Sequence, residues 1–380
     1  MYVAKQFTVR YVDGNGNDLL PQEEIAQLDI EYTFYPKSID GYVPMQDEIS
    51  GITSENTSIT FEYCQICNDL LFIGLDSSGN ETTDESKIVA YTVGGIGNCN
   101  NPYVAIPSTY NNKSVTKMKS EAFKNNALLK YVIIPDSIDT VEYRTFFYCA
   151  NLKKAKINTK KISSQAIAYC GSIVSVEIGS NVEIINSGAF TECKKINEFK
   201  INSEKLVLGQ RIFIPSNLID EIKINSNNNS YTVSDGVLYT KNMKNLVLFP
   251  PNKQGKYILP NVVENILSYS CNDCKIEEIE GVENVKSIGS RAFYYTNLNK
   301  IKINIKIINQ QSLYCCGNLE KVELGNNIEK INTSAFQDCG KLTSVQYDGT
   351  KDQWNAISKN GWNNNSSITK VICTDGEIQL

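Results

Sequence analysis

The sequence contains no histidine, although it is 380 residues long. Without imidazole, it lacks the side chain that most often serves as a general base near neutral pH, and Ser-His or Cys-His nucleophile pairs cannot form. An enzyme that works without histidine, through carboxylates or lysine, is therefore a weak alternative, and we expect no enzymatic activity. Histidine ligands for metal ions are excluded as well, and no cofactor is expected.

The chain also lacks a strong charge bias and a long apolar run. Its 37 basic and 42 acidic residues leave a net charge of −5, with both signs interspersed. A nucleic-acid-binding protein needs a basic patch or stripe, so we expect no nucleic-acid partner. No run approaches the roughly 18 apolar residues of a membrane-spanning helix, so no membrane insertion is expected. The opening MYVAKQFTV is unlike a signal peptide, and no cell-wall anchor is visible.

What the sequence does contain is a phrase that recurs every 21 to 23 residues. Each copy has a short apolar strand, a turn, and a small residue followed by an apolar one, three residues before a cysteine. Residues 173–178 (IVSVEI) lead in this way to Ala189, Phe190 and Cys193, and residues 319–324 (LEKVEL) begin another copy. Such a period predicts a β-rich leucine-rich-repeat solenoid, a fold whose long surface serves binding more often than catalysis.

Five of the twelve cysteines occupy one repeat position: Cys149, Cys170, Cys193, Cys316 and Cys339. Equivalent positions stack in a solenoid, so we expect an interior ladder of free thiols that act as small hydrophobes. Whether any stacked pair oxidises stays open. Residues 64–67 and 271–274 have the CxxC spacing of zinc or redox sites, but they are far apart and neither flank looks helical. They are therefore expected to be structural thiols, and no metal is expected.

The sequence divides into four predicted segments. These are a small β module (residues 1–67), a transition and N-terminal cap (68–105), the solenoid (106–347) with a hairpin insertion at about 228–262, and a C-terminal cap (348–380). Trp354 and Trp362 are expected to seal the open end of the core, with carbohydrate stacking as the alternative. Residues 13–18 superficially match a calcium loop but lack its sixth-position glycine and flanking helices, so a hairpin turn is expected.

The repeat region resembles the BspA-like leucine-rich-repeat family. The resemblance rests on the Ala-Phe…Cys phrase, on residues 106–109 (IPST), on the insertion at 231–239 and 246–251, and on the tail from Tyr347 to Gly376. Single repeats depart from the pattern, with Ile167 and Leu313 in place of phenylalanine and Asn126 and Thr296 in place of cysteine. The family implies bacterial cell-surface or secreted proteins that function in adhesion without catalysis.

The N-terminal module resembles a mucin-binding-protein (MucBP) domain. The resemblance lies in residues 9–16 (VRYVDGNG), 39–42 (IDGY) and 60–63 (TFEY). It implies a β-grasp-like module found in surface proteins of gut bacteria. It does not by itself say whether this copy binds mucin.

The strand phrase places its first, fourth and sixth residues in the core and its third and fifth on the opposite face. The candidate ligand surface on that face consists of Lys154, Lys156, Glu177, Glu198, Lys200, Glu221, Lys223, Glu278, Glu280, Lys300, Lys302, Lys321 and Glu323. A solvated sheet with internally paired charges explains the same pattern and stays open as an alternative. Aromatic residues are scarce on this face, which disfavours sugar stacking.

Together these observations predict a non-catalytic surface recognition or adhesion protein. Its partner is expected to be a host or microbial glycoprotein or matrix protein, bound through the solenoid. A receptor-binding protein of a phage or mobile element is the alternative, because it would need no signal peptide. The sequence leaves open which segment binds.

Overall fold

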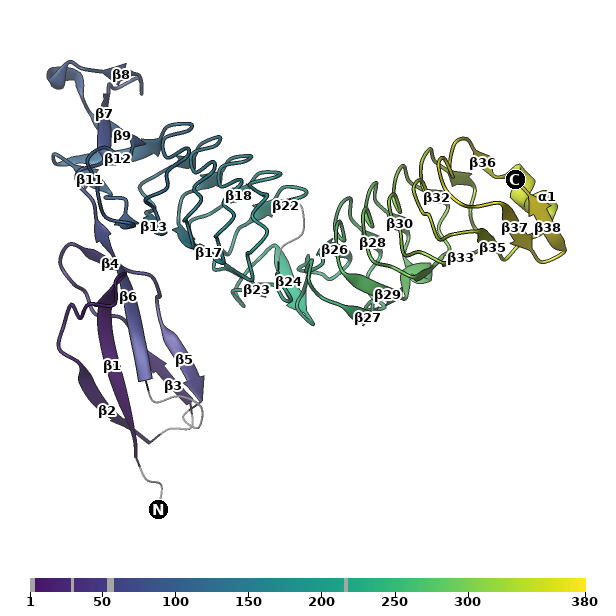
Figure 1. Cartoon of the computed structure of the whole chain (residues 1–380), viewed down its shortest axis with the longest axis horizontal. Helices are drawn as coiled ribbons and strands as arrows, with labels where there is room; N and C mark the ends of the chain where they lie inside the picture. Colours follow the sequence, from purple (N-terminus) through teal and green to yellow (C-terminus); the bar gives the residue numbers. More distant parts are fainter. Residues whose placement is uncertain (1–3, 29–30, 53–57, 215–217) are drawn as a thin grey trace. The chain divides into compact units, whose positions relative to one another are not determined.

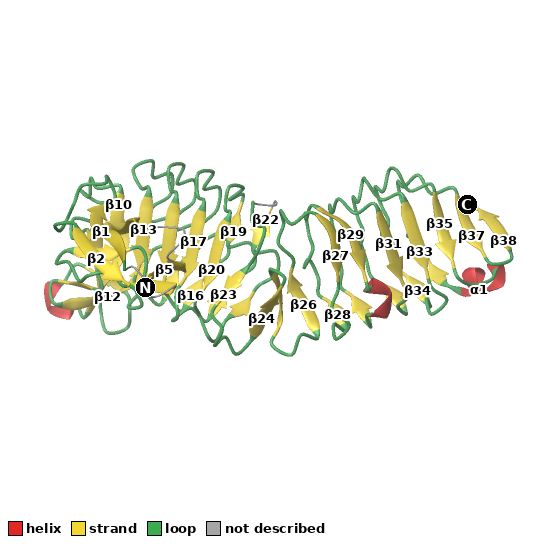
Figure 2. Cartoon of the chain, turned by 90° about the horizontal axis from the view of Figure 1, so that it is seen from below, coloured by secondary structure: helices red, strands yellow, loops and turns green. Residues whose placement is uncertain are grey.

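The computed structural model describes residues 4–28, 31–52, 58–214 and 218–380. Residues 1–3 lie outside the described residues. They belong to the opening segment that we expect not to be a signal peptide. The chain forms two compact units, Met1–Val182 (unit 1) and Glu183–Leu380 (unit 2). Both are built from short strands that follow one another as rungs (Figures 1 and 2), so the predicted β-rich leucine-rich-repeat solenoid is confirmed.

The first six strands form the N-terminal module of unit 1. They are β1 (Lys5–Asp13), β2 (Glu23–Gln27), β3 (Glu31–Phe34), β4 (Tyr42–Pro44), β5 (Ile49–Ile52) and β6 (Ser58–Ile66). β1 pairs antiparallel with β2 and parallel with β6, and β3 pairs with β5. Alternate residues of β1 and β6, such as Phe7 and Phe61, build an aromatic core, as period-two patterning predicts.

The turn after β1 is a plain hairpin turn, as expected. Asp13 accepts hydrogen bonds from the backbone N–H of Asn15 (2.8 Å) and Asn17 (2.9 Å) and from the Asn17 side-chain amide. Its carboxylate is thus occupied within its own loop. The assignment of the module as β-grasp-like stays a prediction.

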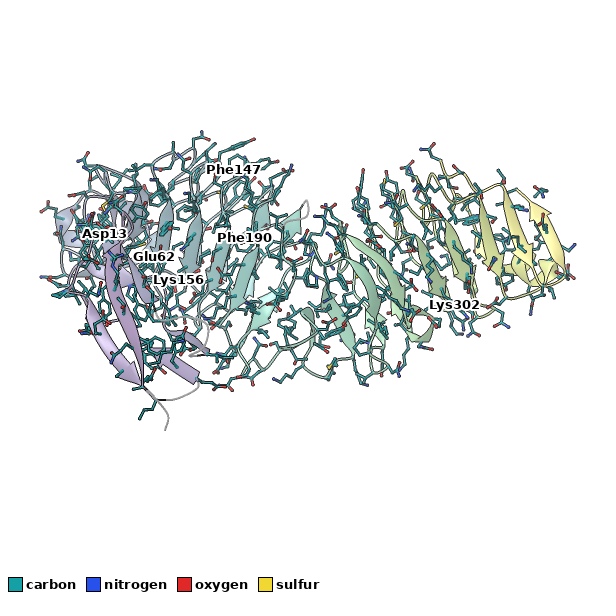
Figure 3. The ribbon with its side chains drawn as sticks, turned by 60° about the horizontal axis from the view of Figure 1, so that its bottom comes forward. Asp13, Glu62, Phe147, Lys156, Phe190 and Lys302 are labelled. Atoms are coloured by element: carbon teal, nitrogen blue, oxygen red, sulfur yellow. A yellow bond between two sulfur atoms is a disulfide. The ribbon has the colours of Figure 1, made fainter. Side chains whose placement is uncertain are left out.

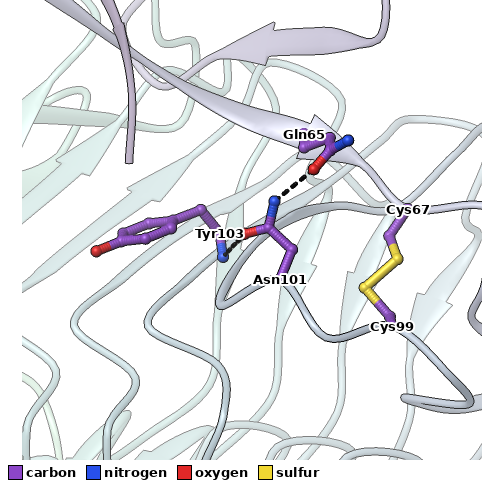
Figure 4. Close-up of a disulfide and its surroundings, with 5 residues drawn as sticks. All are labelled: Gln65, Cys67, Cys99, Asn101 and Tyr103. Atoms are coloured by element: carbon purple, nitrogen blue, oxygen red, sulfur yellow. Dashed lines mark hydrogen bonds between the residues drawn. A yellow bond between two sulfur atoms is a disulfide. The ribbon is translucent and has the colours of Figure 1, made fainter. Parts of the chain in front are cut away.

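Between the module and the repeats, the chain forms a separate sheet. Its strands are β7 (Leu71–Leu75), β8 (Glu81–Thr82), β9 (Ala90–Gly95), β11 (Thr109–Tyr110) and β12 (Lys113–Met118), with the short 3-10 helix η1 (Glu85–Lys87) after β8. A disulfide joins Cys67, directly after β6, to Cys99 (Figure 4). This corrects the expectation that Cys67 is a structural free thiol.

The rungs of unit 1 begin within the N-terminal module itself. Its long rung strands are β10 (Tyr103–Ala105), β13 (Tyr131–Ile134), β15 (Lys154–Ile157) and β17 (Ser175–Ile178), all parallel, and its short ones are β14 (Thr140–Val141) and β16 (Lys161–Ile162). β6 pairs with β1 along residues 58–63 and with β10 at Gln65 and Ile66. One strand therefore belongs to both the module and the repeat sheet.

Unit 2 continues the same design through the C-terminal repeats. Its long strands are β20 (Glu198–Ile201), β23 (Lys223–Ile224), β27 (Gly255–Ile258), β29 (Ile276–Glu280), β31 (Lys300–Ile303), β33 (Lys321–Leu324), β35 (Ser344–Tyr347), β37 (Lys370–Cys373) and β38 (Gly376–Gln379). Its short strands are β18 (Ile184–Ile185), β19 (Phe190–Thr191), β21 (Val207–Leu208), β22 (Phe213–Ile214), β28 (Asn265–Ile266), β30 (Ser287–Ile288), β32 (Ile307–Ile308), β34 (Lys330–Ile331) and β36 (Ser358–Lys359). The insertion holds the antiparallel strands β24 (Tyr231–Ser234), β25 (Val237–Thr240) and β26 (Asn245–Leu248), and the 3-10 helix η2 (Val282–Asn284) follows β29.

The repeat cysteines are buried and carry reduced thiols, as predicted. Cys149, Cys170, Cys316 and Cys339 are also hydrogen-bond donors, which the sequence pattern did not indicate. The thiol of Cys149 donates to the carbonyl of Phe123 (3.1 Å), that of Cys170 to Phe146 (3.0 Å), and that of Cys316 to Phe293 (3.0 Å). Each acceptor lies at the aromatic position of the preceding repeat, so the ladder links consecutive repeats through their turns.

The last repeat is covered by the helix α1 (Lys351–Ala356) and the segment after it. Thr350 and Gln353 form a reciprocal capping box at the start of α1, which satisfies two backbone donors that would otherwise lack partners. Trp354 and Trp362 are buried and pack edge to face with centroids 5.5 Å apart. Trp362 also contacts Phe336 of the last repeat. These contacts agree with the expected capping role.

Candidate binding surfaces

The charged strand face arises from simple alternation along each rung strand. In β31 and β33, Ile301, Ile303, Val322 and Leu324 are buried in the core. The residues between them, lysine or glutamate, must therefore point to the other side of the sheet. The sequence assigned the two faces in the same way.

In unit 1, the candidate residues of the strand face are engaged by the N-terminal module. Lys154 pairs with Glu62 of β6 (2.6 Å), and Lys156 pairs with Asp47 (2.6 Å) and approaches Glu177 (3.8 Å). Figure 3 shows Glu62 and Lys156 on this face. The side chain of Lys156 is only 13% exposed. These three candidates, Lys154, Lys156 and Glu177, are thus largely committed to contacts within unit 1.

The pKa of Lys154 reflects its ion pair with Glu62. Burial by itself lowers the pKa of a lysine, but the ion pair with Glu62 outweighs burial, and the pKa of Lys154 is raised. The ammonium also lies over the ring of Tyr131, 4.8 Å from its centroid. Lys154 therefore stays charged and held in place throughout the physiological pH range.

Four further candidates lie on the first rungs of unit 2. Lys223 pairs with Glu221 (3.3 Å), and both side chains are about 60% exposed. Such a pair contributes little to stability. On β20, Glu198 is exposed and Lys200 is half-buried, and Lys200 stands beside Lys223 in register. These residues form a polar surface on the first rungs of unit 2.

The other six candidates come together in a groove of about 410 Å³. Glu278, Glu280, Lys300, Lys302, Lys321 and Glu323 all line it. The exposed Ile258 of β27 also lines it, and so does η2, which Gly281 introduces with a left-handed φ of 88°. The sequence predicted these side chains to share a face, but the hollow depends on η2 and β27 and was not predicted.

Most charges in the groove are paired. Lys300 contacts Glu278 (2.7 Å), Lys321 contacts Glu323 (2.5 Å), and Lys256, just outside the groove, contacts Glu280 (2.6 Å). Hydrogen bonds from the two lysine partners hold the pKa of Glu280 and of Glu323 below its usual range. Lys302 makes no ion pair with any residue in the part of the chain that the structure describes. It is exposed and stands beside Glu323 in register, but Glu323 forms its ion pair with Lys321, so the charge of Lys302 is only partly compensated on this face.

The cysteines of the two CxxC segments have other contacts in the structure. Cys67 is bonded to Cys99, and the Cys64 thiol donates to the sulfur of Met45 (3.4 Å). Cys271 and Cys274 are buried, and burial raises the pKa of Cys271 to about 12, so no reactive thiolate forms there near neutral pH. Among the described residues, no group of three cysteine, aspartate or glutamate side chains is placed to hold a metal ion. Within the same residues, no helix has the length and apolarity needed to cross a bilayer.

Sequence reasoning missed a second surface, on the turns that follow the short strands. We call it the turn face. In unit 2 it carries Tyr294, Tyr295 and Tyr314, and in unit 1 it carries Tyr148 and Tyr169. Figure 3 shows Phe147 on these loops, away from Lys156. A signal was present: Tyr148 and Tyr169, like Tyr294 and Tyr314, are separated by one repeat length.

Comparison with known proteins supports the fold reading. A protein-family model, described as a BspA type leucine-rich repeat region, matches the sequence in six copies over residues 116–244 and 247–369. None of the curated proteins matches the sequence.

Several solved structures are similar to the chain. A leucine-rich cell surface protein from Faecalibacterium prausnitzii is 21% identical over 77% of this chain and 96% of that one, with a TM-score of 0.41. The pneumococcal vaccine antigen PcpA is 19% identical over 76% and 84%, with a TM-score of 0.47. A leucine-rich repeat protein from Eubacterium ventriosum is 18% identical over 81% and 99%, with a TM-score of 0.48. Since the family model spans more than half of the sequence, the chain belongs to the BspA-type leucine-rich repeat family.

Proposed function

We propose that this chain is a non-catalytic recognition protein of a bacterial surface, which binds a protein or glycoprotein partner through its solenoid. The observation that carries the proposal is the groove on the strand face of unit 2. It is hollow, it is lined by the exposed Ile258, and charged side chains surround it. Membership of the BspA-type family and the N-terminal resemblance to a mucin-binding-protein module support placement at the cell surface.

Lys302 is the residue through which the groove recognises its partner in this proposal. The neighbouring lysines are matched by glutamates, so much of their attraction is already used within the sheet. Lys302 is free to pair with a carboxylate of the partner. Such a contact steers association and selects the partner more than it adds affinity.

The test uses an array of extracellular-matrix and serum proteins, mucins and glycans, probed with the whole chain. For a bound protein or glycoprotein, Lys302→Glu is expected to weaken binding by about tenfold, since a like charge then faces the partner's carboxylate. Lys330→Glu is the matched control, because Lys330 is also exposed and makes no ion pair with a described residue but lies on β34, outside the groove. Equal effects of the two substitutions, or no binding on the array, would contradict the proposal.

A further inference from the structure

The turn face of unit 2 carries a compact set of aromatic and arginine side chains. We call it the tyrosine–arginine surface, and it consists of Arg211, Tyr269, Arg291, Tyr294, Tyr295 and Tyr314. All six come from the turns of consecutive repeats. They lie near one another because equivalent turn positions stack from rung to rung.

Tyr269 contacts both arginines and helps to hold their side chains in place. The Arg211 guanidinium lies 4.8 Å from the centroid of Tyr269, and Nη1 of Arg291 donates to the Tyr269 hydroxyl at 2.8 Å. Nε of Arg291 donates to Gln311 at 2.6 Å. Fixed in this way, both arginines lose little side-chain entropy when they bind a partner.

The tyrosines present their edges to solvent. Tyr294 and Tyr314 are stacked, with centroids 5.2 Å apart and an interplanar angle of 15°. Tyr295 stands nearly perpendicular to Tyr294, at 69°, and is 51% exposed. Because the stacked rings cover each other's faces, they offer ring edges rather than flat platforms, and the Tyr314 hydroxyl already bonds to Asp338. This favours a protein partner over a sugar ring.

The repeat architecture does not require aromatic residues at these positions. The repeat that follows Tyr314 has Gln337 and Asp338 there, and an earlier repeat has Thr191 and Glu192. Asp338, Glu192 and Tyr295 share the same left-handed backbone, with φ between 58° and 59°. The backbone is thus common to polar and aromatic repeats, and an exposed aromatic cluster at this place needs another reason, which interaction with a partner supplies.

The same arrangement occurs a second time, in unit 1. Arg144 lies over Phe147 (4.5 Å) and donates through Nε to Gln165 (3.0 Å), as Arg291 does to Gln311. Tyr148 and Tyr169 are stacked at 4.9 Å, and Tyr148 is 50% exposed. Two occurrences within one chain argue against a chance cluster.

A hollow of about 270 Å³ adjoins the tyrosine–arginine surface. Arg211 and Tyr269 line it together with the apolar side chains of Leu208, Leu248 and Leu267. Nε of Arg211 is buried and has no hydrogen-bond partner among the described residues. The hollow therefore offers room for an apolar side chain next to an unused donor.

From these features we infer that the tyrosine–arginine surface of unit 2 is a protein-docking site, distinct from the groove on the strand face. Its partner is a folded protein that inserts an apolar side chain beside Arg211, packs against the exposed ring of Tyr295 and presents carboxylates to the two arginines. Tyrosine and arginine dominate the energetics of protein interfaces, whereas lysine and glutamate are depleted in their cores. The inference rests on the proposed function, because it assumes that the chain binds a protein.

The experiment compares variants of the whole chain on the same array of matrix and serum proteins, mucins and glycans. For a bound protein, Tyr295→Ala and Arg291→Ala are each expected to lower affinity by about tenfold or more. The matched control is Tyr35→Ala, since Tyr35 is 66% exposed but belongs to the N-terminal module. Tyr295→Phe, which keeps the ring, tests whether the hydroxyl contributes.

The outcomes separate this inference from the proposed function. A bound protein whose affinity is unchanged by Tyr295→Ala and Arg291→Ala overturns the docking site while leaving the proposed function intact. Binding to glycans alone overturns the docking site as well. An array without any bound protein or glycoprotein counts against both. Thermal unfolding of each variant must match that of the parent chain, and Tyr295→Phe provides a folded variant if the alanine forms are unstable.

Discussion

At the scale of single residues, the repeat cysteine is the most informative side chain. Its sulfur fills a small apolar site, and its S–H donates to a carbonyl of the preceding repeat, as in the contact of Cys170 with Phe146. A purely apolar residue would supply only the first of these contributions. We therefore expect a thiol to stabilise this position more than alanine or valine would.

This account predicts the effect of substitutions at Cys170. Cys170→Val keeps the apolar volume but removes the donor, so the free energy of unfolding is expected to fall by about 1 kcal/mol. Cys170→Ala also leaves a cavity and is expected to cost about 2 kcal/mol. Urea unfolding measures both values. Cys373→Val is the control, because the buried Cys373 thiol donates to none of the described residues, and equal losses at the two sites would contradict the role of the hydrogen bond.

At the scale of secondary-structure elements, β6 connects the N-terminal module to the solenoid. It pairs with β1 on one stretch and with β10 on the next. Met45 and Cys64 of the module pack with Ala105 and Ile133 of the rungs, and the Lys154–Glu62 ion pair adds a polar contact beside them. The module therefore covers the first rungs, as a capping segment of a solenoid must.

The Lys154–Glu62 pair makes a prediction about stability and pH. Lys154→Met is expected to lower the free energy of unfolding by about 1–2 kcal/mol, more than an exposed pair contributes. Burial lowers the pKa of Lys154. The ion pair with Glu62 raises it by more, so the pKa of Lys154 in the folded chain lies above its ordinary value. The stabilisation is thus fully present below the ordinary lysine pKa of about 10.4 and is lost as the pH rises through the folded value.

Urea midpoints at pH 8 and pH 11 test this prediction. The difference between the parent chain and Lys154→Met should shrink at the higher pH. Lys160→Met is the control, because the Lys160–Asp139 pair also joins two rungs of unit 1 but each of its side chains is 55% exposed. The Lys160→Met substitution is expected to lower the free energy of unfolding by less than about 0.5 kcal/mol. A Lys154→Met variant no less stable than Lys160→Met would show that the module contact contributes nothing.

At the scale of the whole molecule, the disulfide and β6 determine where the chain can be divided. Fragments ending at residue 67 and beginning at 106 would separate Cys67 from Cys99 and β6 from β10. Such fragments would lose affinity through unfolding as well as through loss of a binding site. Surface substitutions in the intact chain therefore locate binding more reliably than expression of separate segments.

The disulfide gives a prediction for the stability of the intact chain. Cys67 and Cys99 are 32 residues apart in the sequence. A disulfide that closes a loop of this size stabilises a folded protein by about 2–4 kcal/mol. The double variant Cys67→Ala/Cys99→Ala should unfold at correspondingly lower urea. A reducing agent should destabilise the parent chain to the same level and leave the variant unchanged. If the parent chain were insensitive to reduction, the disulfide would have no role in its stability.

The sequence by itself determined the repeat fold, because core residues at a constant period can be buried only by stacking equivalent turns. The same period identified the cysteine ladder and the charged face, since a strand sends alternate side chains to opposite sides. The capping role of Trp354 and Trp362 followed from the need to close the open core. Each of these inferences depends on local spacing alone.

Only the tertiary structure decided which surface residues act together. Lys156 is nearly buried because Asp47, more than a hundred residues earlier, reaches it, and no local pattern contains that contact. The groove needs η2 beside β29, and Cys67 finds Cys99 rather than Cys64. Within each unit, the tyrosines of the turn face come together because left-handed turns stack in register. These features depend on contacts between distant segments, which packing of the whole chain establishes.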